Sequence, residues 1–381
     1  MSTALINARV LLDAGWRDDC AVLIEGARIS TILAHDDPRV TAADHHHDLK
    51  GNVLVPGFID VQVNGGGGVL FNDAPTLDSI RRIGAAHRRF GTTGFLPTLV
   101  SDEIDVMRAA IGAVQAAIDD GVPGVLGIHL EGPYIAAAKR GAHDAARFRL
   151  PDTEEFELVC SLRGGRTVLT LAPEQATPDL VRAFSARGVI VSLGHSNASY
   201  EQARAALDAG ASGFTHLFNA MSALQGRSPG MVGAALEDAA SWVGIIVDGH
   251  HVHPASLRVA RAAKAHGKLI LVTDAMPPVG ADDGDFMLAG QRVITRNGRC
   301  ENEQGSLAGS ALDMAGALRN SIAWLGVDLD EATRMASTWP AQFLGLGATH
   351  GRIEAGWMAD LVELDGDLQV QRSWIAGFAS N

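Results

Sequence analysis

Short apolar runs alternate with helical patterns through the middle of the chain. The runs have the length and composition of buried strands, and the segments between them carry apolar residues at helical spacing, as at Leu77, Ile80 and Ile83. Eight strand-and-helix units are what a closed barrel needs, so the pattern predicts an α/β protein with a TIM-like (β/α)8 barrel. The expected strands span residues 57–63, 94–99, 124–130, 167–171, 189–193, 213–216, 242–247 and 269–273.

An open, doubly wound sheet is the alternative arrangement for the same alternation. That fold is favoured when a Gly-x-Gly-x-x-Gly turn follows the first strand and when ligands gather at one switch point. The first expected strand has no such turn, and polar residues follow many strands rather than one. We therefore favour the barrel, with two further helices expected near residues 312–324 and 331–343.

The two ends of the chain carry a different pattern, with short β-rich runs separated by Gly, Asp and Pro. Such runs are typical of a small sheet. The sequence predicts one discontinuous β-sandwich domain from residues 1–55 and 348–381, with the barrel at 56–347. We expect the histidine triplet at 45–47 to lie in a solvated loop. The β-rich runs are residues 4–12, 20–33, 49–55, 351–364 and 368–375.

Composition limits the expected partners and the cellular compartment. The 381 residues are 47% hydrophobic, and their formal net charge is −13. A strongly acidic chain binds nucleic acid poorly, so no nucleic-acid partner is expected. No apolar segment reaches about 18 residues and no signal pattern begins the chain, which predicts a cytoplasmic protein without a membrane partner. Cys20, Cys160 and Cys300 are widely spaced, so we expect reduced thiols rather than disulfides or a zinc knuckle.

Titratable side chains stand at the carboxyl ends of four expected strands. Glu131 ends one apolar run, His195 and His216 follow two others, and Asp274 follows the last. In a barrel these ends meet in one crater, whatever their distance along the chain. A single histidine at a strand end is usually hydrogen-bonded to the backbone, but four such groups together favour a functional site.

Glu131, His195 and His216 supply one carboxylate and two imidazoles. Three protein ligands with an open position are typical of a catalytic zinc or iron site. Water in the open position has its pKa lowered toward ~7, which provides hydroxide for attack at neutral pH. Asp274 would take the proton of that water and return it to the leaving group, acting as general base and then general acid.

Six motifs carry a resemblance to a known family. They are Pro-Gly-Phe-Ile-Asp-Val-Gln-Val-Asn-Gly at 56–65, His-Leu-Glu-Gly-Pro-Tyr at 129–134, Gly-His-Ser at 194–196, Thr-His-Leu-Phe-Asn-Ala-Met at 215–221, Asp-Gly-His-His at 248–251 and Val-Thr-Asp-Ala-Met at 272–276. Together they resemble the N-acetylglucosamine-6-phosphate deacetylases of the amidohydrolase superfamily, and the likeness extends through both ends of the chain. Pro-Gly-Phe-Ile-Asp alone would indicate only the superfamily.

One departure from the superfamily concerns the number of metal ions. Many members carry His-x-His after the first strand and hold two metals, whereas this chain has Gln62 and Asn64 there. Neutral amides are poor ligands for such ions, so we expect one divalent metal ion. Zinc is the first expectation, and iron, cobalt or manganese would also suit a Glu-His-His set.

The resemblance also implies contacts at the acyl end of the substrate. His143 would polarise the acyl carbonyl beside the metal, and Ala142 belongs to the same loop. We expect the preceding Lys139 and Arg140 to be solvated and to lie outside the site. A second loop would close over the acetyl methyl and favour acetyl over bulkier groups. Its residues are Leu307, Ala308 and Gly309.

At the other end of the substrate, the resemblance implies that Asn219 and Ala220 hold the sugar and phosphate. Arg227 and His251 match a phosphate-binding pair, and Arg suits phosphate because its planar fork donates two hydrogen bonds at once. In relatives the arginine reaches across from a second subunit. We therefore expect a homodimer in which Arg227 completes the partner's site.

The expected reaction is hydrolysis of the N-acetyl group of N-acetylglucosamine 6-phosphate, which gives glucosamine 6-phosphate and acetate. Deacetylation of N-acetylgalactosamine 6-phosphate, or hydrolysis by another kind of amidohydrolase, is the first alternative, because the sequence does not resolve the configuration of one hydroxyl. A barrel that binds a sugar phosphate without hydrolysing it is the second alternative. The complete set of Asp274 and three metal ligands disfavours it.

Overall fold

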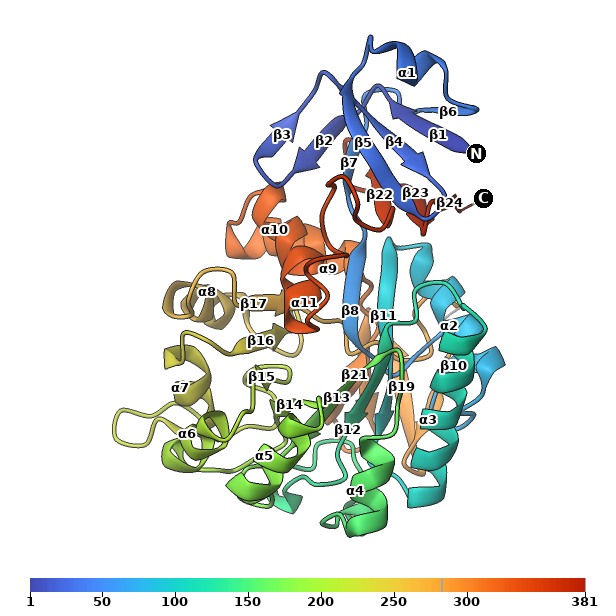
Figure 1. The fold of residues 1–381 in the computed structure, drawn as a ribbon. Coiled ribbons are helices and arrows are strands. Elements are labelled where there is room, and N and C mark those ends of the chain that lie inside the picture. The colour runs from blue at the N-terminus through green and yellow to red at the C-terminus, as the bar shows by residue number, and fades with distance from the viewer. Residues whose placement is uncertain (282–283, 381) are drawn as a thin grey trace.

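The computed structural model describes residues 1–281 and 284–380 and contains eight parallel strands that form a nearly closed barrel (Figure 1). Each strand pairs with the next one along the chain. The first and last strands meet where the amide of Asp274 donates to the carbonyl of Gln62 at 3.0 Å. This confirms the predicted (β/α)8 barrel. Its strands are β8 (Phe58–Val63), β11 (Thr92–Val100), β12 (Gly127–Glu131), β13 (Arg166–Leu171), β14 (Ile190–Leu193), β15 (Gly213–Phe214), β16 (Trp242–Ile245) and β17 (Leu269–Leu271).

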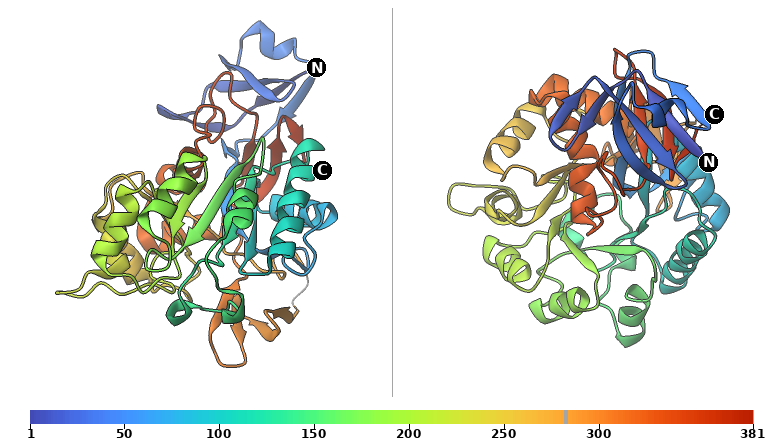
Figure 2. Two further views of the ribbon diagram at one scale, coloured as in Figure 1. Left: turned by 60° about the horizontal axis from the view of Figure 1, so that its bottom comes forward. Right: turned by 45° about the horizontal axis from the view of Figure 1, so that its top comes forward.

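Helices surround the barrel, and several begin at side chains suited to an N-cap. Thr76, Thr177 and Ser199 each accept a hydrogen bond from an amide of the following first turn. Seen from one end, the helices form a ring around the strands (Figure 2). Among the described residues, no helix has both the length and the apolar character needed to span a bilayer. The ring consists of α2 (Leu77–Arg88), α3 (Ile104–Asp119), α4 (Thr153–Val159), α5 (Pro178–Ala186), α6 (Tyr200–Asp208), α7 (Gly230–Glu237) and α8 (Pro254–Ala263).

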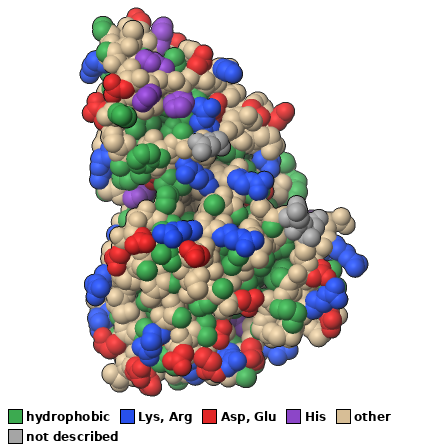
Figure 3. Space-filling model, turned by 90° about the vertical axis from the view of Figure 1, so that its right-hand side faces the viewer, with side chains coloured by type: hydrophobic (Ala, Val, Ile, Leu, Met, Phe, Trp, Pro, Cys, Tyr) green, Lys and Arg blue, Asp and Glu red, His purple; other side chains and the backbone are tan. Residues whose placement is uncertain are grey.

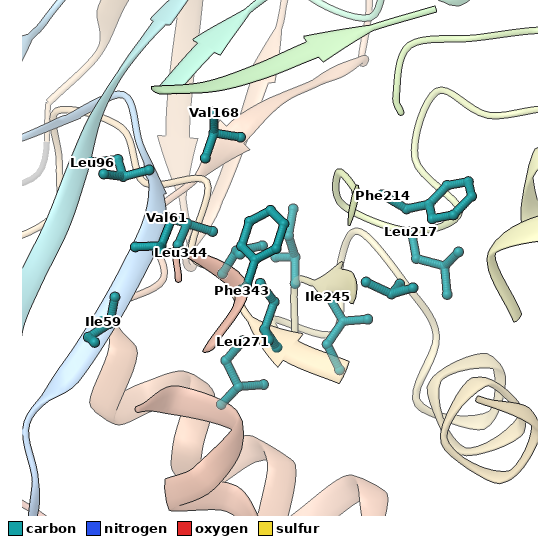
Figure 4. Close-up of a cluster of buried hydrophobic side chains, with 14 of the residues drawn as sticks. Ile59, Val61, Leu96, Val168, Phe214, Leu217, Ile245, Leu271, Phe343 and Leu344 are labelled. Carbon is teal, nitrogen blue, oxygen red and sulfur yellow. The ribbon is translucent and has the colours of Figure 1, made fainter. Parts of the chain in front are cut away.

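The helices expected after the barrel are present, and the second is divided into two. α9 (Met314–Asn320) continues into a π-helical turn, and α10 (Leu329–Ala336) is followed by α11 (Thr338–Phe343). Phe343 lies inside the barrel near Val61 (Figure 4). A Cβ atom on Gly213 would lie 2.9 Å from the Phe343 ring, so the glycine leaves room for it. An aromatic side chain therefore fills the end of the barrel where β15 begins.

Strands from both ends of the chain form two further sheets beside the barrel (Figure 1). β7 pairs antiparallel with β22, so residues more than 300 positions apart share one sheet. The division of the chain at residues 55 and 348 stays a prediction. One sheet contains β5 (Arg28–Ala34), β4 (Cys20–Glu25), β1 (Ser2–Ile6) and β6 (His45–Asp48), and the other contains β24 (Phe378–Ala379), β23 (Val370–Ile375), β22 (Leu361–Leu364), β7 (Val53–Pro56), β2 (Arg9–Leu12) and β3 (Gly15–Arg17).

The expectation of a loop at the histidine triplet is wrong. His45, His46 and His47 belong to β6, an edge strand that pairs in parallel with β1. Figure 3 shows histidine side chains gathered at this end of the molecule. An edge strand of polar residues has no alternation of apolar and polar positions, so the sequence pattern did not indicate it.

An antiparallel sheet that the apolar pattern did not predict follows the last barrel strand. The amide of Ser310 donates to the carbonyl of Asp274 at 2.9 Å, which ties this sheet to the barrel. Leu307, Ala308 and Gly309 therefore lie in a strand and not in the expected loop. The strands are β18 (Phe286–Leu288), β19 (Gln291–Arg296), β20 (Arg299–Asn302) and β21 (Leu307–Ser310).

A buried histidine supports the small hairpin of β9 (Gly65–Gly66) and β10 (Val69–Leu70). Nε2 of His87 lies 2.9 Å from the carbonyl oxygen of Gly65. A carbonyl only accepts, so Nε2 carries the ring proton. Burial lowers the pKa of His87 to about 4.

Because buried His87 resists protonation, the folded protein should lose stability in acid. Its folded-state pKa of about 4 lies below the unfolded value near ~6.5, so the unfolded chain binds the proton more readily. The stabilisation of the folded state by neutral His87 is fully present above pH ~6.5 and is lost as the pH falls through ~4. The loss amounts to roughly 3 kcal/mol of unfolding free energy. Denaturant unfolding from pH 7 to 4 should show a shallower loss in His87→Gln. The exposed His35→Gln variant serves as the control, and equal slopes in all three proteins would contradict the assignment.

Candidate metal and hydrolytic site

Three side chains from three strand ends converge on one point. Oε1 of Glu131 lies 2.9 Å from Nε2 of His216 and 3.2 Å from Nε2 of His195. The two Nε2 atoms are 3.0 Å apart. All three residues are buried, and they form the one group of potential metal ligands found among the described residues. The structure thus brings together the three ligands that the sequence predicts.

The donor atoms of this cluster fit a divalent cation. Nδ1 of His195 lies 2.8 Å from the carbonyl oxygen of Lys139, so Nδ1 carries the proton and Nε2 presents a lone pair. Nε2 of His216 faces the same carboxylate oxygen. Two imidazole nitrogens and one carboxylate oxygen match the ligands of catalytic zinc sites, in which a further position stays open. A backbone carbonyl behind a metal-binding histidine is also the usual second contact that fixes its tautomer.

The charges of the cluster reinforce one another. Burial would raise the pKa of Glu131, but its close contacts with the imidazoles of His195 and His216 outweigh burial and hold that pKa well below its usual value. Burial would lower the pKa of His216, but the hydrogen bond and charge of Glu131 outweigh it and raise that pKa. Glu131 is therefore ionised, and a buried carboxylate needs a cationic partner.

The backbone at the site adopts a conformation that non-glycine residues rarely take. φ is +46° at His195, +31° at His216 and +53° at Asp274. Such positive angles cost free energy, and they cluster at functional sites where the surrounding structure holds them. These three residues turn their side chains from strand ends into the cavity.

Two amides connect Asp274 to the cluster. Nε2 of Gln62 donates to Oε1 of Glu131 and to Oδ1 of Asp274, at 3.1 Å in both cases. Nδ2 of Asn64 donates to the same Asp274 oxygen at 2.6 Å. Burial, followed by the charge of Glu131, raises the pKa of Asp274 to about 6. Gln62 thus acts as a donor that holds both carboxylates, and Asn64 as a donor that holds Asp274.

His143 lies beside the cluster with its ring 4.5 Å, centroid to centroid, from that of His195. Burial, followed by the neighbouring His195 imidazole, lowers the pKa of His143 to about 3. The imidazole is therefore neutral and can donate a hydrogen bond from one nitrogen only.

The cluster opens into a cavity of about 550 Å³. Two predicted site residues lie outside its lining. Ala308 is buried in the apolar cluster with Met276 and Leu288, and Arg227 is exposed on the loop that projects before α7 (Figure 2). The predicted residues that do line the cavity are Glu131, Ala142, His143, His195, His216, Asn219, Ala220, His251, Asp274, Leu307 and Gly309.

The wall beyond His216 is polar. Nδ1 of His251 lies 2.6 Å from Oδ2 of Asp248, which fixes the ring. Asn219 donates to the carbonyl of His216 at 3.2 Å, and Ala220 has a φ of +49°. This wall therefore presents held imidazole and backbone groups to the cavity.

A second part of the cavity wall, which was not predicted, is apolar. Val100, Met276 and Leu288 line the cavity there and pack together in one buried cluster. Lys139 and Arg140, which we expected to be solvated outside the site, also line the cavity. Their place four and three residues before His143, in the same segment, was the sequence signal that could have included them.

Comparisons with known proteins agree with this architecture. A family model described as "Amidohydrolase family" matches residues 53–380. The chain is 46% identical to the N-acetylgalactosamine-6-phosphate deacetylase of Shewanella sp. (strain ANA-3), covering 97% of this chain and 94% of that protein. It is 38% identical to the N-acetylglucosamine-6-phosphate deacetylase of Vibrio furnissii, covering 97% and 92%. The crystal structure of N-acetylglucosamine-6-phosphate deacetylase from Pasteurella multocida superposes with a TM-score of 0.96 at 35% identity, covering 100% of both chains.

Proposed function

The chain belongs to the amidohydrolase family, and on that premise we propose that it hydrolyses the N-acetyl group of N-acetylglucosamine 6-phosphate to glucosamine 6-phosphate and acetate. One observation carries the proposal: Asp274 and the Glu131, His195 and His216 cluster line a single cavity, with Gln62 donating to both carboxylates. A proton acceptor held beside a three-ligand metal cluster suits metal-assisted amide hydrolysis.

Glu131, His195 and His216 would hold one divalent cation, for which we propose zinc. When bound, the cation supplies Lewis acidity, which polarises the acyl oxygen and lowers the pKa of water toward neutrality. Gln62 and Asn64 use their amide hydrogens on carboxylates, which supports a single cation. Metal analysis of protein purified without added metal tests the choice of zinc.

Asp274 and His143 act on different atoms of the amide group. Asp274 accepts a proton from the attacking water and delivers it to the amide nitrogen as the carbon–nitrogen bond breaks, so that acetate and an amine leave. His143 donates a hydrogen bond to the acyl oxygen, where negative charge develops. Gln62 and Asn64 hold the Asp274 carboxylate in place throughout.

The polarity of the walls orients the substrate. The polar wall with Asn219, Ala220 and His251 suits the sugar hydroxyls and phosphate, and the apolar wall with Met276 and Leu307 suits the acetyl methyl.

Cys20, Cys160 and Cys300 are all free thiols, which supports a reducing, cytoplasmic location.

We propose that Arg227 completes the phosphate site of a partner subunit in a homodimer. Arg227 is exposed on a projecting loop that also exposes 54% of Leu224. A guanidinium that binds phosphate should not point into solvent, whereas a loop of this kind can insert into a second copy of the chain.

A mixture of two impaired variants, assayed at a substrate concentration well below the KM of Arg227→Ala, tests this arrangement. Arg227→Ala should raise KM at least about tenfold because a charge-assisted contact to phosphate is lost. Subunits carrying Arg227→Ala and subunits carrying Asp274→Asn, when dissociated and reassembled together, should regain activity. Each mixed dimer then holds one site with an intact Asp274 and an arginine from its partner. Activity that never exceeds that of the separate variants would place Arg227 outside the partner's site.

The galactosamine isomer is the second candidate substrate, favoured by the 46% identity to a deacetylase of that name. Acetate release from both N-acetylhexosamine 6-phosphates, measured side by side with zinc-loaded protein, decides between them. We expect the larger kcat/KM for the glucosamine compound, and a larger value for the galactosamine compound would reverse the assignment. Unphosphorylated N-acetylglucosamine is the control for phosphate recognition, and no acetate release from any of the three would defeat the proposed reaction.

A further inference from the structure

Ser101 follows the last residue of β11 and contacts Nδ1 of the His143 ring. The backbone nitrogen of Ser101 lies 3.3 Å from Nδ1 of His143, and its Oγ lies 2.8 Å from the same atom. Ser101 is buried, with 6% of its surface exposed. No other hydrogen bond to the His143 ring occurs among the described residues.

The backbone amide decides which ring nitrogen of His143 carries the proton. An amide N–H only donates, so the atom it faces must present a lone pair. If Nδ1 were protonated, two hydrogens would point at each other across 3.3 Å. Nδ1 is therefore the acceptor, and the proton of the neutral ring is on Nε2, the nitrogen that Ser101 does not contact.

The room for this contact comes from the motif that ends β12. A Cβ atom on Gly132 would lie 2.2 Å from Oγ of Ser101, and Gly132 has a φ of +85°. Any side chain at position 132 would therefore displace the serine hydroxyl. Gly132 stands immediately after Glu131, so one short motif provides a metal ligand and the space behind His143.

We propose that Ser101 is a positioning residue for the hydrolysis. Its amide keeps Nδ1 of His143 as an acceptor, and its Oγ, which lies 2.8 Å from Nδ1 and 3.4 Å from the carbonyl oxygen of Glu131, holds the ring in place. The ring then presents an Nε2–H donor to the acyl oxygen. In the other tautomer, Nε2 would present a lone pair to an oxygen that is gaining negative charge. This inference rests on the proposed deacetylase function, but the tautomer can be tested without it.

The first test is spectroscopic. In zinc-loaded, full-length protein labelled with ¹⁵N-histidine, the His143 signals are those lost in His143→Gln. Nitrogen shifts should show a protonated Nε2 and an unprotonated Nδ1 in the wild-type protein. A protonated Nδ1 would overturn the proposal, whatever the substrate proves to be.

The second test is a double-mutant cycle on turnover. Ser101→Ala should lower kcat about tenfold with little change in KM. This loss is smaller than the ~100- to 1,000-fold loss expected when an oxyanion donor is removed outright, because the Ser101 amide remains. In a His143→Gln background, Ser101→Ala should change kcat less than about twofold, since its target is gone.

A matched control and a rescue complete the cycle. Ser337 is also buried, and its hydroxyl donates to a backbone carbonyl away from the cavity, so Ser337→Ala should keep normal kcat. Ser101→Thr retains the hydroxyl and should recover most of the lost turnover. Equal losses from Ser101→Ala in both His143 backgrounds would overturn the proposal. A wild-type protein with the Nε2–H tautomer but no deacetylase activity would defeat the proposed function and leave the Ser101 contact standing.

Discussion

Asp274→Asn is expected to lower kcat by about 100- to 10,000-fold, the range for removal of a general acid–base group. Asparagine cannot accept the proton of the attacking water, whereas its side-chain oxygen can still accept from Gln62 and Asn64. Metal content and substrate binding should therefore remain close to normal. Steady-state kinetics, metal analysis and substrate titration of the purified variant measure the three quantities.

The control for this variant is a half-buried aspartate away from the cavity. Burial also raises the pKa of Asp360 to about 6, but Asp360 lies with the terminal strands, where it accepts from the amide of Ala376. Asp360→Asn should keep normal turnover. Near-normal turnover in Asp274→Asn, or an equal loss in both variants, would remove Asp274 from the proposed chemistry.

Removal of the metal should have the other large effect. Lewis-acid stabilisation of several kcal/mol corresponds to a loss of at least about 100-fold in kcat when the protein is treated with a chelator. Zinc should restore the activity. The thermal midpoint should also fall on chelation, because a ligand that binds only the folded state stabilises it, by about 4 kcal/mol at a free concentration ~1,000 times Kd.

A variant that lacks one metal-binding side chain separates the effect of metal loss from damage to the protein by the chelator. His216→Ala removes one of the three converging atoms, so its thermal midpoint should no longer respond to chelation and zinc should not restore activity. The exposed His266→Ala should respond as the wild-type protein does. A chelator response in His216→Ala equal to that of the wild-type protein would contradict the proposed ligand set.

The signals that the sequence carried most clearly were local. Apolar runs of strand length, such as the one ending at Glu131, predicted the barrel strands to within a few residues. The strands without such a pattern were missed. β6 consists of His45 to Asp48 on a sheet edge, and β21 is Leu307 to Ser310, in which small residues follow one leucine. Both strands form because a neighbouring strand pairs with them, and their own residues do not indicate it.

The positions of the three potential metal ligands could be predicted from the barrel fold alone, without knowledge of individual side-chain contacts. Because the carboxyl ends of parallel barrel strands meet, Glu131, His195 and His216 could be placed together from their positions in the chain alone. The same argument places Gln62 and Asn64 near these ligands, but it does not show that both amides donate to Asp274.

The order of apolar and polar residues by itself determined the number of barrel strands and the position of Glu131, His195, His216 and Asp274 at the carboxyl ends of four of them, since strands appear as apolar runs and these residues follow directly. Tertiary structure alone decided which of those side chains touch. Ser101 and His143 are 42 positions apart, and only the packing of β11 against the segment after β12 brings their atoms to 2.8 Å. Hydrogen bonds depend on distances of tenths of an ångström, which no one-dimensional pattern records.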